Sequence, residues 1–225
     1  MMDEFRGFQT KIMPITVGDR TFNLLCPAVS DELLSRPSIA ARFECDAYLP
    51  YWAQLWTCGL MLSDKLMEWG LPPGSHPSVL EIGCGLGVVS MTMCHLGYRV
   101  WASDYDEDAL EFLRHNIERN SLPKAELVFV DWREPQPEMT FDRVVASDIL
   151  YETYHLAPVA RYIYNHLKPQ GLAFIADANR SIADDFEAIA KDNGLEMQKI
   201  TPAERMDPEK PRLVKGRIFH LIRSA

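Results

Sequence analysis

Several features that mark particular classes of protein are missing from this sequence. Its five cysteines include no CxxC pair and have no histidines spaced around them as zinc ligands would be. An odd number of isolated cysteines is typical of reduced thiols inside a cell. We therefore expect a cytoplasmic protein without a disulfide framework and without a metal site. The cysteines are Cys26, Cys45, Cys58, Cys84 and Cys94.

Long apolar runs and an excess of positive charge are also missing. No apolar segment has the length of a membrane span, and the first residues, MMDEFRGFQTK, contain neither an apolar core nor an arginine-rich pattern. We therefore expect no membrane span, secretory signal or transit peptide. The 32 Asp and Glu residues outnumber the 23 Lys and Arg residues, and the net charge is −9. Broad binding of nucleic acid requires clustered cations, so this balance argues against nucleic acid as a partner.

Strand and helix patterns alternate along most of the chain. A hairpin is predicted within residues 11–27 around the turn Gly18-Asp19, followed by an amphipathic helix within residues 50–70. From residue 78 onward, short apolar runs alternate with helical patterns at 87–96, 106–119 and 155–168. The strand candidates are SVLEIG, RVWASD, AELVFVD, FDRVVASD, GLAFIAD, LEMQKI and GRIFHLIR.

This alternation predicts an α/β fold with an open, doubly wound, mostly parallel sheet and helices on both faces. The last two strand candidates are expected to pair antiparallel. We divide the chain into an N-terminal extension with a β-hairpin, residues 1–50, and a main domain, residues 51–225. Ligands of such a sheet bind at the carboxyl ends of its strands.

The stretch VLEIGCGLGVVS, residues 79–90, is the most informative part of the sequence. A buried strand runs into Gly83, Gly85 and Gly87 and then directly into a helix. Glycines there permit positive φ and let the backbone approach a ligand, although a tight turn alone would also need them. A dinucleotide site has the spacing GxGxxG, whereas this loop reads GxGxG after Glu81. Asp104 ends the next strand, where its carboxylate can accept hydrogen bonds from the ribose of either class of cofactor.

The segment LEIGCGLG, together with Asp104, resembles the first motif and the following acidic position of class I S-adenosylmethionine-dependent methyltransferases. LKPQG is similar to a turn common in that superfamily, and the resemblance covers about residues 78–180. It implies a Rossmann-like, seven-stranded sheet with an antiparallel last strand and S-adenosylmethionine as the cofactor over the strand ends. Glu81 would shape the loop near the methionine moiety, Gly83 and Gly85 would pass under the cofactor, and Asp104 would hold the ribose.

A narrower resemblance connects three further stretches with the methyltransferase-16 group of protein-lysine methyltransferases, one branch of which methylates the electron-transfer-flavoprotein β subunit. PYWAQLWTCGLMLSDKL is similar to the segment before the first motif, VDWRE to the stretch that borders the adenine, and DILY to the group's DxxY motif. The chain departs from the pattern at Thr57-Cys58, where many relatives have proline and a small residue. The positions that match are Trp52 and Trp56, Asp131 and Trp132, and Asp148 and Tyr151.

These residues also have plain structural interpretations. Trp52 and Trp56 lie four residues apart at the start of the predicted helix, where core packing is the default for such a pair. Asp131 and Asp148 could each cap a turn or a helix, and Trp132 could be a core residue. We assign Trp56, Asp131 and Trp132 to the cofactor site and Asp148 and Tyr151 to catalysis. His155 and Tyr154 are expected to be structural.

The resemblance implies methyl transfer to a lysine of a protein substrate. Deprotonating a free lysine at neutral pH costs about 4 kcal/mol, because its pKa of 10.4 lies about three units higher. An ionised Asp148 beside the amine raises that pKa, so we expect Asp148 to dock the amine rather than to act as its base. Tyr151 would supply a hydrogen bond or an aromatic wall.

Other functions stay open from the sequence. The acceptor could be a small molecule or another protein side chain, such as histidine or glutamine. Asp148 to Tyr151 lack the prolines of the motif that accompanies methylation of nucleobase amines. A nicotinamide-dependent oxidoreductase fits the glycine spacing poorly, and a non-catalytic binding module would not need Asp104 and Asp148 together.

Overall fold

The structure is a computed structural model that describes residues 4–28, 39, 43–44, 49–71, 73–134 and 139–223. Cys45 and most of the extension between the predicted hairpin and residue 49 lie outside these ranges. The described residues form one sheet of three strands and one of seven strands.

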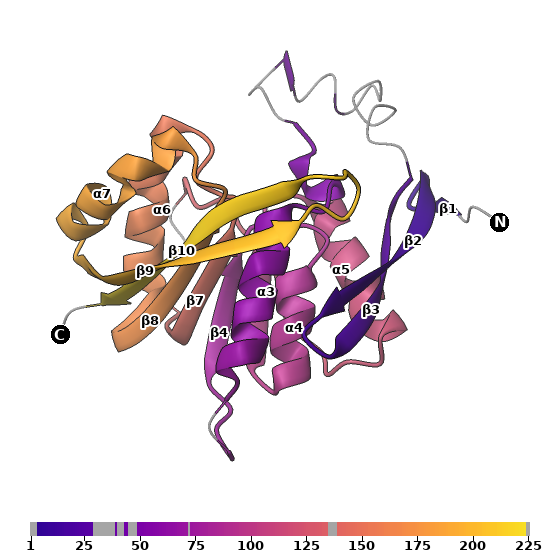
Figure 1. The fold of residues 1–225 in the computed structure, drawn as a ribbon, viewed down its shortest axis with the longest axis horizontal. Coiled ribbons are helices and arrows are strands. Elements are labelled where there is room, and N and C mark those ends of the chain that lie inside the picture. Colours follow the sequence, from indigo (N-terminus) through magenta and orange to yellow (C-terminus); the bar gives the residue numbers. More distant parts are fainter. Residues whose placement is uncertain are drawn as a thin grey trace.

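The elements follow one another in the order that Figure 1 labels. The small sheet contains β1 (Glu4–Phe5), β2 (Phe8–Val17) and β3 (Arg20–Pro27). The 3₁₀ helix η1 (Tyr51–Ala53) and α3 (Thr57–Trp69) then lead to β4 (Ser78–Ile82), α4 (Val88–Leu96), β5 (Arg99–Asp104), α5 (Glu107–Arg119) and β6 (Glu126–Phe129). The chain continues through β7 (Phe141–Ser147), α6 (Thr153–His166), β8 (Leu167–Asp177), the 3₁₀ helix η2 (Ser181–Asp185) and α7 (Phe186–Asp192). It ends with β9 (Leu195–Met206) and β10 (Leu213–Arg223).

The large sheet has the strand order β6-β5-β4-β7-β8-β10-β9 (Figure 1). β4 pairs in parallel with β5 and β7, whereas β10 lies antiparallel between β8 and β9. The predicted doubly wound, mostly parallel sheet with an antiparallel last strand is therefore confirmed. The chain winds outward from β4 to β6 and then returns to β7 on the other side of β4. Diverging connections of this kind leave a crevice at the carboxyl ends of the two central strands.

Alternate residues of the central strands face opposite layers of helices. Val79 of β4 and Phe174 of β8 pack in one core with side chains of α3, α4 and α5. Their neighbours Leu80 and Ile175 pack in a second core with side chains of α6 and α7. The period of two along each strand therefore explains why apolar residues follow one another without alternation in these strands, since both faces of the sheet are covered.

The LKPQG segment and the region after β8 differ from the predictions. LKPQG was expected as a turn before a strand but lies inside β8 as an irregularity. Phe141 pairs with Leu167, whereas Arg143 pairs with Leu172, so the intervening residues of β8 bulge. Gln170 has a φ of 61°, and the proline before it has no N–H to donate to the ladder. η2 and α7 were not predicted at all.

Two asparagines, one in α5 and one directly after it, attach the N-terminal hairpin to the main sheet. Asn116 accepts a hydrogen bond from the N–H of Leu25 (2.7 Å) and donates to the carbonyl oxygens of Leu25 (3.1 Å) and Leu86 (3.2 Å). Asn120 makes the same two-way contact with the backbone of Asn23. The two side chains act as a substitute strand edge for β3. Because Leu86 belongs to the glycine loop, Asn116 also ties the hairpin to that loop.

Replacing Asn116 by alanine is expected to lower the free energy of unfolding by about 2–4 kcal/mol. The substitution removes several hydrogen bonds of a fully buried amide and leaves the backbone groups of Leu25 and Leu86 without partners. Chemical denaturation measures the loss. Asn193→Ala is the matched control, because Asn193 donates one side-chain hydrogen bond, to Ile189 of its own helix, and should cost about 1 kcal/mol or less. Equal losses for the two variants would contradict this account.

Candidate active site

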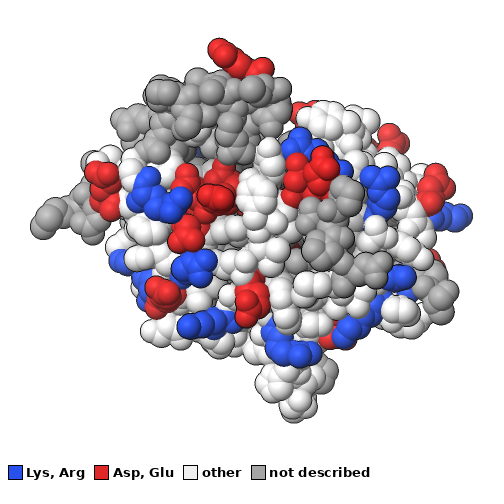
Figure 2. Space-filling view, turned by 180° about the vertical axis from the view of Figure 1, so that it is seen from behind, with Lys and Arg blue, Asp and Glu red and all other residues white. Residues whose placement is uncertain are grey.

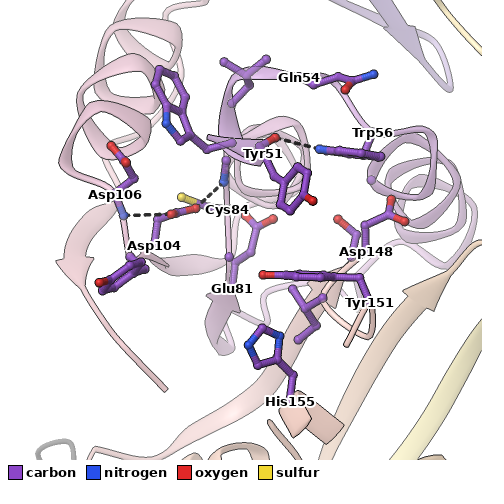
Figure 3. Close-up of a pocket in the computed structure, with 18 of the residues that line it drawn as sticks. Tyr51, Gln54, Trp56, Glu81, Cys84, Asp104, Asp106, Asp148, Tyr151 and His155 are labelled. Carbon is purple, nitrogen blue, oxygen red and sulfur yellow. Dashed lines mark hydrogen bonds between the residues drawn. The ribbon is translucent and has the colours of Figure 1, made fainter. Parts of the chain in front are cut away.

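A cavity of about 590 Å³ opens at the carboxyl ends of β4, β5 and β7, where the windings of the sheet diverge. Every residue that the sequence analysis assigned to the site lines it: Trp56, Glu81, Gly83, Gly85, Asp104, Asp131, Trp132, Asp148 and Tyr151. Figure 3 shows Asp104 and Asp106 at one end and Asp148 and Tyr151 at the other, with Glu81 and Cys84 between them. The structure therefore brings the predicted residues together, while their individual roles stay predictions.

The glycine loop runs close to the backbone that precedes α3. Gly83 and Gly85 have φ values of 67° and 50°, a region that residues with a side chain rarely adopt. A Cβ atom on Gly85 would lie 3.4 Å from the carbonyl oxygen of Trp52, and one on Gly83 would lie 3.1 Å from Ile149. Glycine is needed here both for the backbone conformation and for the space that remains above the loop.

Asp104 braces this loop from the end of β5. Its Oδ2 accepts a hydrogen bond from the N–H of Gly85 (2.8 Å) and its Oδ1 accepts one from the N–H of Asp106 (3.0 Å). A carboxylate has about four lone-pair positions, so it retains acceptor capacity toward the cavity. Burial raises the pKa of Asp104 to about 6, although the hydrogen bond from Gly85 opposes that rise. From the sequence, Asp104 was predicted to bind a ribose. The structure adds its hydrogen bond with Gly85 of the glycine loop.

Glu81 is the least exposed acid of the cavity. Its carboxylate accepts a hydrogen bond from the hydroxyl of Ser90, in the first turn of α4, and the hydroxyl of Ser103 donates to its carbonyl oxygen at 2.7 Å. Burial raises the pKa of Glu81 to about 8, so the group is mainly uncharged at neutral pH. Glu81 thus joins β4 to α4 beneath the loop.

One wall of the cavity carries buried polar atoms without partners. The indole nitrogen of Trp132 and Nδ1 of His155 are both inaccessible to solvent and have no hydrogen-bond partner among the described residues. Their rings meet edge to face, with centroids 5.7 Å apart. Burial lowers the pKa of His155, which is therefore neutral at pH 7. His155 was expected to be structural, and the structure places it in the lining of the cavity. Two unpaired polar atoms on an otherwise apolar wall fit a heterocycle with hydrogen-bonding edges, such as adenine.

Asp131 does not present a free carboxylate to this wall. Arg133 binds it in a bidentate manner, with Nε to Oδ1 at 2.7 Å and Nη2 to Oδ2 at 2.7 Å. Burial opposes ionisation of Asp131, but the hydrogen bonds from Arg133 outweigh it and lower the pKa. The guanidinium of Arg133 also lies over the ring of Tyr105, 4.9 Å from its centroid. Asp131 therefore holds Arg133 and Tyr105 at the edge of the cavity.

Trp52 and Trp56 do not share a helix, contrary to the sequence analysis. Trp52 lies in η1 and packs edge to face against Phe8, so it is a core residue whose backbone covers Gly85. Trp56 precedes α3, and its indole N–H donates to the carbonyl oxygen of Tyr51 at 2.8 Å. The break between η1 and α3 separates the two tryptophans, and it leaves Trp56 at the rim beside Tyr51.

Asp148 follows β7 in a conformation that is unusual for a residue with a side chain. Its φ is 59°, and its N–H donates to the carbonyl oxygen of Ala176 at 2.9 Å. It does not cap α6, because that helix begins at Thr153 after Glu152 and has no side-chain cap. The capping alternative is therefore wrong. The strained backbone instead turns the carboxylate into the cavity (Figure 3).

An arginine that the sequence analysis missed pairs with this carboxylate. Nη2 of Arg180 lies 2.6 Å from Oδ1 of Asp148, whereas Oδ2 of Asp148 is buried and has no hydrogen-bond partner among the described residues. Burial raises the pKa of Asp148, although the charge of Arg180 opposes that rise. Asp177 and Arg180 follow a predicted strand in the segment DANR, a signal that could have suggested a charged group at this edge.

Aromatic rings enclose the space around Asp148. Tyr51 meets Tyr151 edge to face at 5.5 Å and Trp56 at 5.9 Å. Burial raises the pKa of Tyr151 to about 12, so its hydroxyl stays protonated at neutral pH and can donate a hydrogen bond. A cavity wall made of these aromatic rings beside a carboxylate suits a long aliphatic side chain that ends in a polar group.

Comparison with known proteins agrees with this geometry. Residues 79–171 match a family described as a methyltransferase domain. The N-methyltransferase NodS from Bradyrhizobium japonicum, solved with S-adenosyl-L-homocysteine, has a TM-score of 0.59 and 15% identity over 73% of this chain and 86% of its own. The fold, the glycine loop and the match over residues 79–171 make this chain similar to class I S-adenosylmethionine-dependent methyltransferases, whose cofactor is S-adenosylmethionine.

Curated relatives of this chain differ in what they modify. The protein N-lysine methyltransferase METTL21A of Xenopus tropicalis is 33% identical over 126 residues, which are 52% of this chain and 56% of the relative. The histidine protein methyltransferase 1 homolog of Dictyostelium discoideum is 28% identical over 129 residues, 55% of this chain and 41% of the relative. Others are ubiquinone biosynthesis O-methyltransferases. The chain spans about half the length of the curated relatives it matches, and these names leave the methyl acceptor open.

The described part of the chain contains no helix with the length and apolar character of a membrane span. Within the same residues, no group of three or more His, Cys, Asp or Glu side chains is placed to hold a metal ion.

The affinity for S-adenosylhomocysteine is expected to fall about tenfold between pH 7 and pH 5. Asp104 accepts hydrogen bonds as a carboxylate, and one pH unit below its pKa of about 6 only about a tenth of the group stays ionised. Calorimetric titration across this range measures the change. Asp104→Asn should bind weakly at pH 7 and lose most of the pH dependence. If the affinity of Asp104→Asn for S-adenosylhomocysteine fell equally steeply with pH, a group other than Asp104 would be responsible for the titration.

Proposed function

We propose that this protein transfers a methyl group from S-adenosylmethionine to the amine of a lysine side chain in a protein substrate. The observation that carries the proposal is the buried carboxylate of Asp148, which has one oxygen without a hydrogen-bond partner among the described residues. This carboxylate lines the same cavity as the glycine loop and the rings of Tyr51, Trp56 and Tyr151. The lysine and histidine protein methyltransferases among the relatives support a protein side chain as the acceptor.

The residues of the cavity fit the cofactor along its length. Asp104 would hold the ribose, and the unpaired nitrogens of Trp132 and His155 suit the edge of an adenine. The backbone of Gly83 and Gly85 leaves room beneath the methionine moiety. When bound, S-adenosylmethionine supplies a methyl group whose bond to the positively charged sulfur breaks as a bond to the acceptor nitrogen forms, which leaves neutral S-adenosylhomocysteine.

The acceptor amine must arrive uncharged, because its lone pair forms the new bond. Holding lysine in this form at neutral pH costs about 4 kcal/mol, as the sequence analysis noted. Oδ2 of Asp148 can accept an N–H of the amine and so orient its lone pair along the line of transfer. The protonated hydroxyl of Tyr151 and the rings of Tyr51 and Trp56 line the approach and limit the access of water. The proton is released to solvent.

The surface gives no support to nucleic acid as the acceptor. On the face shown in Figure 2, Lys and Arg side chains alternate with Asp and Glu side chains rather than gathering in one patch. A duplex or single strand would need a continuous basic surface near the cavity. A small molecule or another protein side chain is the alternative acceptor. We keep the cytoplasm as the proposed location, on the basis of the isolated cysteines.

Incubation of a cell lysate with the protein and methyl-labelled S-adenosylmethionine is the direct test. We expect the label in one or a few proteins, on lysine when their peptides are sequenced by mass spectrometry. Label found only in small metabolites, or on another side chain, would contradict the lysine assignment while leaving methyl transfer itself supported.

Asp148→Asn is expected to lower methyl transfer about 10- to 100-fold, the loss of one hydrogen bond to a charged group. Binding of S-adenosylhomocysteine should stay within about threefold of the original, because its sulfur is uncharged and Asp148 lies beyond it. Asp142→Asn is the matched control. Asp142 lies near the opposite end of β7, bound to Ser78 and Lys168 outside the cavity, and should not alter turnover. Undiminished turnover in Asp148→Asn would remove this residue from the mechanism.

A further inference from the structure

The proposed mechanism does not use Arg180, although this residue lines the cavity. It lies in the segment between β8 and η2, its side chain is 26% exposed, and it contacts Asp148 at the acceptor end. A site built only to attract a lysine ammonium would leave the carboxylate free. Here Oδ1 of that carboxylate is already paired with a permanent cation, and Oδ2 is buried without a hydrogen-bond partner among the described residues, in a carboxylate that also interacts with the thiol of Cys58.

The guanidinium is held in place from behind. Oδ1 of Asp177 accepts the backbone N–H of Arg180 at 2.9 Å, and Oδ2 of Asp177 accepts Nη1 of Arg180 at 3.0 Å. Asp177 has no exposed side-chain surface. The carbonyl oxygen of Arg180 accepts a hydrogen bond from Nη2 of Arg217 at 3.0 Å. The guanidinium of Arg180 therefore cannot turn away from Asp148 without breaking its contact with Asp177, while the two backbone hydrogen bonds fix the position of the residue.

The charges of this cluster cancel. Asp148 and Asp177 are buried, and Arg180 and Arg217 balance them, since Arg217 lies 3.6 Å from Oδ1 of Asp177. Arg217 also reaches Asp184, which is 63% exposed and therefore screened by solvent. The titratable and charged groups of the neighbouring elements are Cys58 of α3, Tyr151 and Glu152 before α6, Asp177 of β8, Asp184 of η2 and Arg217 of β10.

We propose that Arg180 is a positioning residue that neutralises Asp148, so that the acceptor end of the cavity accepts a neutral amine rather than an ammonium. This inference rests on the proposed function. A free carboxylate would stabilise the ammonium and raise the pKa of the amine. Pairing with Arg180 cancels most of the negative charge of Asp148 but keeps Oδ2 as a hydrogen-bond acceptor. The positive sulfonium of the cofactor then repels a protonated amine, and no free carboxylate offsets this repulsion, so the uncharged form of the amine is favoured.

The charge at this position can be measured without turnover. S-adenosylmethionine carries a positive sulfur and S-adenosylhomocysteine a neutral one, so the ratio of their dissociation constants reports the local field. In Arg180→Gln, which keeps hydrogen-bonding capacity toward Asp177, Asp148 is no longer neutralised. We expect this ratio to shift in favour of S-adenosylmethionine by at least about fivefold. Arg180→Lys should keep it within about twofold.

Two controls separate this role from a merely structural one. Arg217→Gln removes a cation from the same Asp177 cluster but not from Asp148, and it should leave the ratio unchanged. Adding Asp148→Asn to Arg180→Gln should return the ratio to near its original value, because both charges are then gone. Thermal unfolding identifies any variant that has lost its fold, and Arg180→Lys still tests the proposal if Arg180→Gln is unstable, since a lysine that failed to keep the ratio would contradict it.

The pH dependence of methyl transfer tests the acceptor side, with poly-L-lysine as the probe. In Arg180→Gln, the acidic limb of the profile for kcat should move up by about one pH unit, because kcat reports the pKa of the bound amine and the unpaired carboxylate of Asp148 raises that pKa. An unchanged binding ratio and an unchanged profile would overturn the role of Arg180, even if lysine labelling supports the proposed function. A shifted ratio with no labelled lysine would support Arg180 as the charge-setting residue and reject lysine as the acceptor.

Discussion

Three acids are buried at the carboxyl ends of β4, β5 and β7, and the site depends on how each of them is compensated. A carboxylate in a protein interior needs hydrogen bonds or a cation, or else it takes up a proton. Glu81 has a hydroxyl and stays largely protonated, Asp104 has two backbone N–H groups, and Asp148 has an arginine. Three similar groups thereby acquire different charges and different capacities toward a ligand.

The compensation also connects the site with the rest of the fold. Asp104 holds Gly85 in a left-handed conformation, and the loop in turn contacts the backbone of Trp52 and, through Leu86, the amide of Asn116. The N-terminal hairpin therefore contributes to the shape of the glycine loop, although it provides no residue at the carboxyl ends of β4, β5 and β7. On the other side, Arg180 links the end of β8 to β10 through Arg217. The antiparallel last strand thus takes part in the charge balance of the acceptor end.

The two ends of the cavity differ in the kind of ligand that they suit. The end near Asp104 offers acceptors and unpaired ring nitrogens, which suit a nucleoside. The end near Asp148 offers aromatic walls and one carboxylate oxygen, in a cluster whose charges cancel. Under the proposed function, a carboxylate that is paired with an arginine suits a neutral nucleophile, whereas a free carboxylate would attract a cation. In this proposal, Asp148 acts through the direction in which it accepts a hydrogen bond rather than through its negative charge.

Local patterns in the sequence were enough to predict the order of most strands and helices, the glycine loop and the acids at the strand ends. Periodicity and glycine spacing are properties of neighbouring residues, and the carboxyl ends of parallel strands necessarily share one edge of the sheet. Contacts between distant segments were beyond such patterns. The pairing of Asp148 with Arg180, the separation of Trp52 from Trp56 and the unpaired nitrogens beside His155 depend on how strands and helices pack. The charge of a buried group is set by neighbours that are close in space rather than in sequence, so the tertiary structure alone decided which acids of the site are free to meet a ligand.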